Sequence, residues 1–146
     1  LTVFFSIGIF MTYIGGLLGD KYGPIKIIRL SLLVWLPAMF LLTEVPTFSP
    51  LIMMPVAYLL LLMIGAAKAI SYSPVIVLGQ TYLAKSIGFA SGITLGVSQT
   101  IGGVIAPVVG NLADTYSLPV AMMTLVPFLV IGLGASLLLK DPKKLQ

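Results

Sequence analysis

The sequence contains no cysteine and no histidine, and charged residues make up only 8% of its 146 residues. Without cysteine, the chain forms no disulfide and offers no thiolate as a nucleophile or soft-metal ligand. Without histidine, Ser-His and Cys-His catalysis are excluded as well, and a metal ion would depend on four scattered carboxylates. We therefore expect no enzyme, no catalytic residue, no metal site and no cofactor.

The scarcity of charge is matched by an excess of apolar residues. Hydrophobic residues make up 59% of the chain and the mean hydropathy is +1.16, far outside the range of soluble proteins. A soluble domain of this size needs more polar surface to cover its core, whereas a chain surrounded by lipid can expose Leu, Ile, Val and Phe. The composition predicts an integral membrane protein.

Apolar stretches recur along the chain, and each is close to or above the ~20 residues that a helix needs to cross the hydrocarbon. They cover residues 1–19, 27–43, 55–81, 88–112 and 119–139. We therefore predict an all-α integral membrane domain over 1–146, with five transmembrane helices. Because the chain starts inside an apolar run, without a methionine or a charged leader, we also expect it to be a fragment that at least one further helix precedes.

The basic residues predict how these helices are oriented, because cytoplasmic loops carry an excess of Lys and Arg. The first and third connections and the tail are basic, whereas the second and fourth carry only Glu44 and Asp114. The basic residues of these connections and of the tail are Lys21, Lys26, Arg29, Lys85, Lys140, Lys143 and Lys144. We predict a multi-pass protein of the plasma (inner) membrane with a cytoplasmic C-terminus. Its basic residues then face lipid headgroups, and no basic and aromatic interleaving indicates a nucleic-acid partner.

A glycine and aspartate motif occupies the first connection, Gly16-Leu17-Leu18-Gly19-Asp20-Lys21-Tyr22-Gly23. It resembles the major facilitator superfamily signature G-x-L-x-D-[RK]-x-G-[RK]-[RK]. The matching residues are Gly16, Leu18, Asp20, Lys21 and Gly23. Pro24 and Ile25 replace the usual pair of basic residues, which leaves Lys26 and Arg29 as displaced substitutes.

Asp20 follows the C-terminal end of a helix, where the helix dipole disfavours a carboxylate. The resemblance implies that Asp20 lies near the positive N-terminus of a neighbouring helix, around Ser86 to Gly88, and latches a cytoplasmic gate together with Lys21. The alternative is an ordinary turn, with glycine for tight geometry and Asp-Lys for solubility.

A second copy of the pattern, Gly110-Asn111-Leu112-Ala113-Asp114-Thr115-Tyr116, ends the fourth apolar stretch at the opposite face. Inverted repeats of three helices place two copies in this way, although a five-residue echo can also arise by chance. We predict that Gly110 and Asp114 are the external counterpart of the cytoplasmic gate.

The fourth stretch is rich in small residues. Gly88, Gly92 and Gly96 have four-residue spacing, which predicts close packing against another helix. The cluster at 102–110 loosely resembles the antiporter-associated motif G-x-x-x-G-P-x-x-G-G. Its alternative interpretation is tight packing with a kink at Pro107, and a gating bend is compatible with both.

Lys68 is the ionisable residue that can lie at the centre of the bilayer, where burial is costly unless it faces a water-filled cavity or an anionic partner. If its helix covers 55–81, Lys68 lies midway. If the helix covers 51–70, Lys68 reaches the cytoplasmic edge. The first alternative is favoured, because the second leaves the apolar residues 74–78 in a loop.

A central Lys68, with Tyr72 one turn along the same face, suits an anionic substrate or a coupling role. Gln99 and Gln80 are weaker candidates for a central cavity, because lone glutamines in membrane helices more often bridge two helices.

Stretches 16–23 and 79–116 together resemble the fosmidomycin-resistance type of drug-efflux carrier, with Ala84 where proline is expected. The resemblance implies most of one six-helix half of a major facilitator fold with inverted repeats. It also implies an alternating-access antiporter that exports a small organic solute or drug against a proton gradient. Its partners would be membrane lipid, the solute and the N-terminal half of the same transporter. A non-transporting membrane receptor or scaffold is the alternative, since helix count and hydropathy fit it equally.

Overall fold

A computed structural model describes residues 2–44 and 50–139, and these residues form helices without a β-strand among them. The elements are α1 (Thr2–Tyr22), α2 (Pro24–Glu44), α3 (Pro50–Tyr82), a 3₁₀ turn η2 (Ala84–Ser86), α4 (Ile87–Thr115), α5 (Leu118–Met123) and α6 (Val126–Leu138). The predicted all-α class is confirmed. The tail lysines Lys140, Lys143 and Lys144 lie outside the described residues.

Membrane-length apolar segments account for most of the described chain. By length and composition, Pro24–Glu44, Leu51–Tyr82, Ala84–Thr115 and Leu118–Leu138 can each cross a bilayer. Many large apolar side chains on these segments are exposed, as lipid-facing side chains are. These features support a multi-pass integral membrane protein.

The reversal between α1 and α2 depends on Gly23. Its φ of +94° is a backbone conformation that L side chains rarely adopt, and its N–H donates to the Gly19 carbonyl oxygen at 2.9 Å. Pro24 then begins α2, where its missing N–H removes no helical hydrogen bond. The glycine and proline therefore end one helix and begin the next.

The fifth apolar stretch differs from the single helix predicted over 119–139, because it divides into α5 and α6 at Thr124 and Leu125. Pro127 favours the break, since it has no N–H to donate to the carbonyl of Met123 and its ring crowds that carbonyl. The chain instead forms a tight turn in which the Leu125 N–H donates to the Met122 carbonyl at 3.1 Å.

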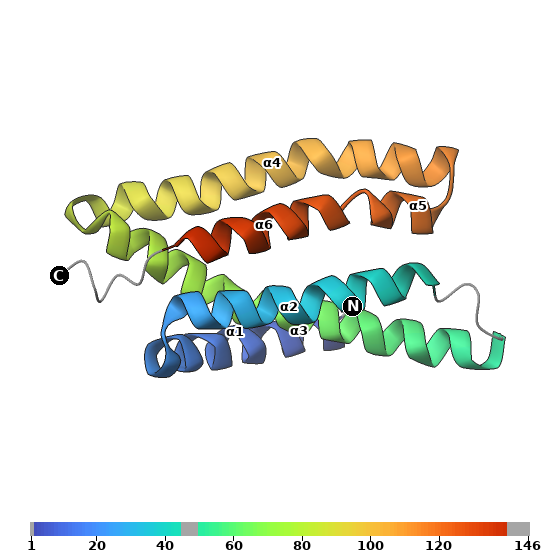
Figure 1. The fold of residues 1–146 in the computed structure, drawn as a ribbon, viewed down its shortest axis with the longest axis horizontal. Coiled ribbons are helices and arrows are strands. Elements are labelled where there is room, and N and C mark those ends of the chain that lie inside the picture. The colour runs from blue at the N-terminus through green and yellow to red at the C-terminus, as the bar shows by residue number, and fades with distance from the viewer. Residues whose placement is uncertain (1, 45–49, 140–146) are drawn as a thin grey trace.

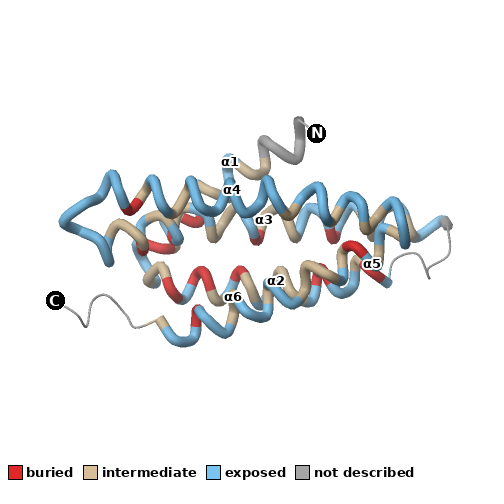
Figure 2. Tube along the Cα trace, turned by 90° about the horizontal axis from the view of Figure 1, so that it is seen from above, coloured by how far each residue is buried: buried red, intermediate tan, exposed pale blue. Residues whose placement is uncertain are grey.

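The helices form two groups (Figure 1). In the first, α1 and α2 both pack against α3. In the second, α4 packs against α5, and α2 joins the groups through contacts with α5 and α6. The C-terminal part of α3 crosses from the first group to α4 (Figure 1). Buried residues are spread over several helices (Figure 2) and form small clusters, of which Ile25, Ile28 and Leu78 make one and Ala38 and Leu60 another.

Candidate functional site

The first copy of the motif lies in the last turns of α1, where α1 packs closely against α3. A Cβ atom added at Gly15 would overlap the carbonyl oxygen of Ile70. A Cβ at Gly16 would lie 3.2 Å from the Ser73 hydroxyl oxygen, so the glycines allow the close approach of the two helices. Asp20 and Lys21 are exposed at the end of α1, and the Lys21 ammonium lies 5.3 Å from the Tyr22 ring centroid.

The latch contact that the resemblance implies for Asp20 is not formed in the described structure. Helix α1 contacts α2 and α3, and none of its described residues contacts η2 or α4. Asp20 is therefore not beside Ser86 to Gly88, because α3 crosses to α4 with its C-terminal part while α1 packs beside its central part. The role of Asp20 in a gate stays a prediction.

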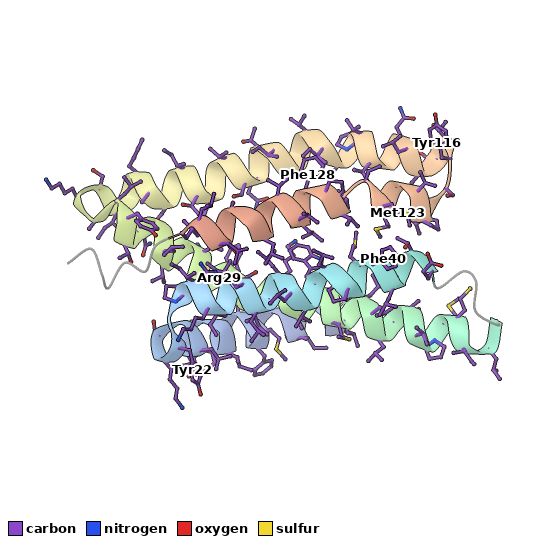
Figure 3. The ribbon with its side chains drawn as sticks, in the orientation of Figure 1. Tyr22, Arg29, Phe40, Tyr116, Met123 and Phe128 are labelled. Carbon is purple, nitrogen blue, oxygen red and sulfur yellow. The ribbon has the colours of Figure 1, made fainter. Side chains whose placement is uncertain are left out.

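The second copy lies in the last turns of α4, at the opposite end of the molecule. Figure 3 shows Tyr22 and Tyr116, which follow the two aspartates, at the two ends. Gly110 and Asp114 are exposed, and the Tyr116 N–H donates to the Leu112 carbonyl at 3.0 Å. A Cβ atom added at Gly110 would meet no described atom within 4 Å. The two copies thus share their place at a helix end and differ in packing.

The glycine stripe of α4 does not pack as predicted. A Cβ at Gly88, Gly92 or Gly96 would meet nothing within 4 Å among the described residues. Instead, the middle of this face lines an open groove of about 440 Å³ with Phe89, Ile93, Val97, Thr100 and Ile101. Among the described residues the predicted packing is not formed, because α4 uses a different face against α3.

The contact between α3 and α4 depends on polar and small residues. Gln80 Nε2 donates to Ser91 Oγ at 2.8 Å, and a Cβ at Gly79 would lie 2.7 Å from the Thr94 hydroxyl oxygen. Gln80 therefore bridges two helices, the role that the sequence favoured for it over a place in a cavity.

A cavity of about 940 Å³ lies between α1, α2, α3 and the α5 region. Lys68 and Tyr72 line it, so the structure brings together two of the three predicted cavity residues. Its other lining residues are Gly8, Ile9, Thr12, Tyr13, Trp35, Met39, Leu42, Leu61, Ile64, Gly65, Ala69, Met122 and Leu125. Gln99 does not line this cavity. It is exposed on α4 beyond the part of that helix that meets α3.

Lys68 lies near the middle of α3, which continues past residue 70 to Tyr82. The observed end of the helix, Tyr82, matches the alternative of 55–81. Its observed beginning, Pro50, is close to that of the alternative of 51–70. Since the helix does not stop at residue 70, Lys68 is not at its end.

Trp35 is a cavity residue that the sequence analysis missed. Its Nε1 atom is buried and has no hydrogen-bond partner in the described structure. Trp35 is the single tryptophan of the chain and lies in the middle of an apolar helix, where its N–H is an unusual polar group. That position was the signal available from the sequence.

Arg29 was expected to replace a basic residue of the motif in the first connection, but its side chain binds the end of another helix. Its Nε and one terminal nitrogen donate to the Ser136 carbonyl at 3.0 and 2.8 Å, and the same terminal nitrogen lies within hydrogen-bond distance of two further carbonyls. These carbonyls end α6, where cations are stabilised by the helix dipole. Arg29 thereby attaches α2 to α6 (Figure 3).

Comparison with known proteins adds one informative match. No family model and no solved structure matches the chain. It is 33% identical over 141 residues, or 97% of its length, to the uncharacterized MFS-type transporter YfnC of Bacillus subtilis (strain 168). The match supports membership in the major facilitator superfamily. The chain spans about a third of that relative's length, 33%.

Similarity to this relative indicates a transport protein of this superfamily and not an enzyme. Its printed description names no substrate, coupling ion or direction, and it does not identify the fosmidomycin-resistance subfamily. Among the described residues, no three potential ligands from His, Cys, Asp and Glu lie together as a metal site.

Proposed function

We propose that this chain is part of a secondary transporter of the major facilitator superfamily that works by alternating access. The observation that carries the proposal is the open cavity around Lys68 and Tyr72, which is lined by residues of long apolar helices. Its volume of about 940 Å³ is within the range of small-molecule sites, about 300 to 1,000 Å³. A charged side chain within a membrane helix marks a path for substrate or ions more often than a structural role.

The two motif copies support gates on either side of this cavity. Alternating access requires one gate at each membrane face, and the copies end α1 and α4 at opposite ends of the molecule (Figure 3). In this proposal, Asp20 and Lys21, with Gly16, Leu18 and Gly23 around them, form the cytoplasmic gate. Asp114 and Gly110 form the external one.

Proton coupling and export are the finer part of the proposal and derive from the resemblance to drug-efflux carriers. The described carboxylates, Asp20, Glu44 and Asp114, are all in the last turns of their helices. A carboxylate that takes up the coupling proton within the membrane would therefore come from the N-terminal half of the same transporter.

Solute flux tests the proposal. The full-length protein is reconstituted into vesicles, and uptake of a panel of drugs and organic anions is measured with and without a proton gradient. We expect gradient-dependent flux that Asp20→Asn and Lys68→Ala abolish. Lys85→Ala, which removes an exposed lysine outside the cavity, serves as the control and leaves flux unchanged. Folded protein that moves none of the solutes in either direction would favour the receptor or scaffold alternative.

A further inference from the structure

We infer that the cavity around Lys68 binds organic monoanions that have an aromatic or aliphatic body, and that it discriminates against cations of the same shape. This inference rests on the proposed transport function and names the substrate class of the same cavity. It follows from which polar groups line the cavity, which are already satisfied, and what the remaining walls are made of.

Two polar groups of the cavity can only donate. Lys68 supplies an ammonium and Trp35 an N–H, and neither group can accept a hydrogen bond. The N–H of Trp35 is buried without a partner in the described structure. The hydroxyls of Thr12, Tyr13 and Tyr72 can donate and accept, and that of Thr12 donates to the Gly8 carbonyl at 2.9 Å. A ligand that satisfies the ammonium and the N–H must bring acceptors.

The charge balance of the cavity favours a negative ligand. Among the described residues that line it there is no carboxylate, so none of them supplies a counter-charge to Lys68. A lysine within a membrane helix is costly unless water or an anion compensates it. A bound carboxylate supplies that compensation, whereas a bound cation would face the ammonium with nothing to offset the repulsion.

The remaining walls suit an apolar body. Aliphatic and thioether side chains surround the polar groups, and Met39 and Met122 adapt to ligands of different shape. Trp35 and Tyr13 add aromatic rings to the lining. Gly65, one turn before Lys68 in α3, also lines the cavity.

Direct binding with three matched probes tests the inference. Naphthoate, naphthylmethanol and naphthylmethylammonium share one aromatic body and differ in charge. Each is titrated calorimetrically into the purified full-length protein in detergent. We expect naphthoate to bind at least about tenfold more tightly than the other two, since a charged hydrogen bond is typically worth that much.

Variants identify the groups responsible. Lys68→Met keeps the length of the side chain without its charge and is expected to weaken naphthoate about tenfold, while Lys68→Arg retains most of the affinity. Trp35→Phe removes only the N–H and is expected to weaken naphthoate more than naphthylmethanol. Lys85→Met is the control with no effect. If Lys68→Met fails to fold, Trp35→Phe and Lys68→Arg still test the site.

Several results would overturn the inference: equal binding of the cation or the alcohol, no binding of naphthoate to folded protein, or unchanged naphthoate affinity in both Lys68→Met and Trp35→Phe. The transport proposal is refuted by a different result. Naphthoate binding without flux of any solute would support the binding site and refute the transport function. Gradient-driven flux of a cation without naphthoate binding would support the transport function and refute the anionic substrate class.

Discussion

The groups α1–α3 and α4–α6 begin alike and pack differently. Each starts with a long helix that ends in the pattern G-x-L-x-D-x-Y and is followed by a helix with proline in its first turn. In the first group, α3 covers the glycines of α1, and its Ile70 and Pro74 lie against Gly15 and Gly19. In the second group, the glycine face of α4 is open among the described residues.

This difference shows that a stripe of small residues allows another helix to pack closely but does not ensure that one is there. Helix α3 packs against both α1 and α2, whereas α4 and α6 share only the short helix α5 as a common neighbour among the described helices. The following predictions test the comparison, from the largest effect to the smallest.

Gly15→Ala should have the largest effect, because the new methyl group would overlap the Ile70 carbonyl oxygen and force α1 away from α3. We expect the full-length protein to lose about 3 kcal/mol of unfolding free energy. Chemical unfolding in detergent measures it, with Gly92→Ala as the matched control on the open helix. Equal stability of the two variants would refute the close contact of α1 with α3.

Arg29→Met should have the next largest effect, because it removes the cation that binds the carbonyls ending α6. Hydrogen bonds from a charged group predict a loss of about 2 kcal/mol. The same unfolding measurement applies, and Lys26→Met, an exposed cation on the same helix, is the control. The attachment of α2 to α6 is disproved if both variants unfold at the same denaturant concentration.

Gln80→Leu should have a moderate effect, since it breaks the hydrogen bond to Ser91 that joins α3 to α4. Polar contacts between membrane helices predict a loss of about 1 kcal/mol. A double-mutant cycle with Ser91→Ala measures the coupling. Gln99→Leu, on the exposed part of α4, is the control, and additive effects of Gln80→Leu and Ser91→Ala would argue against the bridge.

Gly92→Ala should have the smallest effect, because its Cβ would meet no described atom within 4 Å. Alanine is favoured over glycine within a helix, so we expect a change of at most about 1 kcal/mol, in the stabilising direction. Thermal unfolding of the full-length protein measures it. Strong destabilisation would show instead that another part of the full-length protein covers this face of α4.

The elements themselves follow from local sequence. Long apolar stretches predict the helices because backbone groups in lipid must bond within their own segment. Gly23 and Pro24 mark the first reversal because each restricts the backbone locally. The break before Pro127 was missed because proline alone does not decide it. Pro37, Pro74 and Pro107 all lie inside unbroken helices.

From the sequence alone follow the membrane class, the approximate positions of the long helices and the two motif copies at helix ends, whereas the division into α5 and α6 was missed and the depth of Lys68 was left between two alternatives. Which side chains meet depends on the tertiary packing. It keeps Asp20 away from the start of α4, leaves Gln99 outside the cavity and brings Trp35 into it. It also binds Arg29 to a carbonyl 107 residues away. The reason is physical: helix formation depends on neighbours in sequence, whereas a contact between helices depends on which faces pack together.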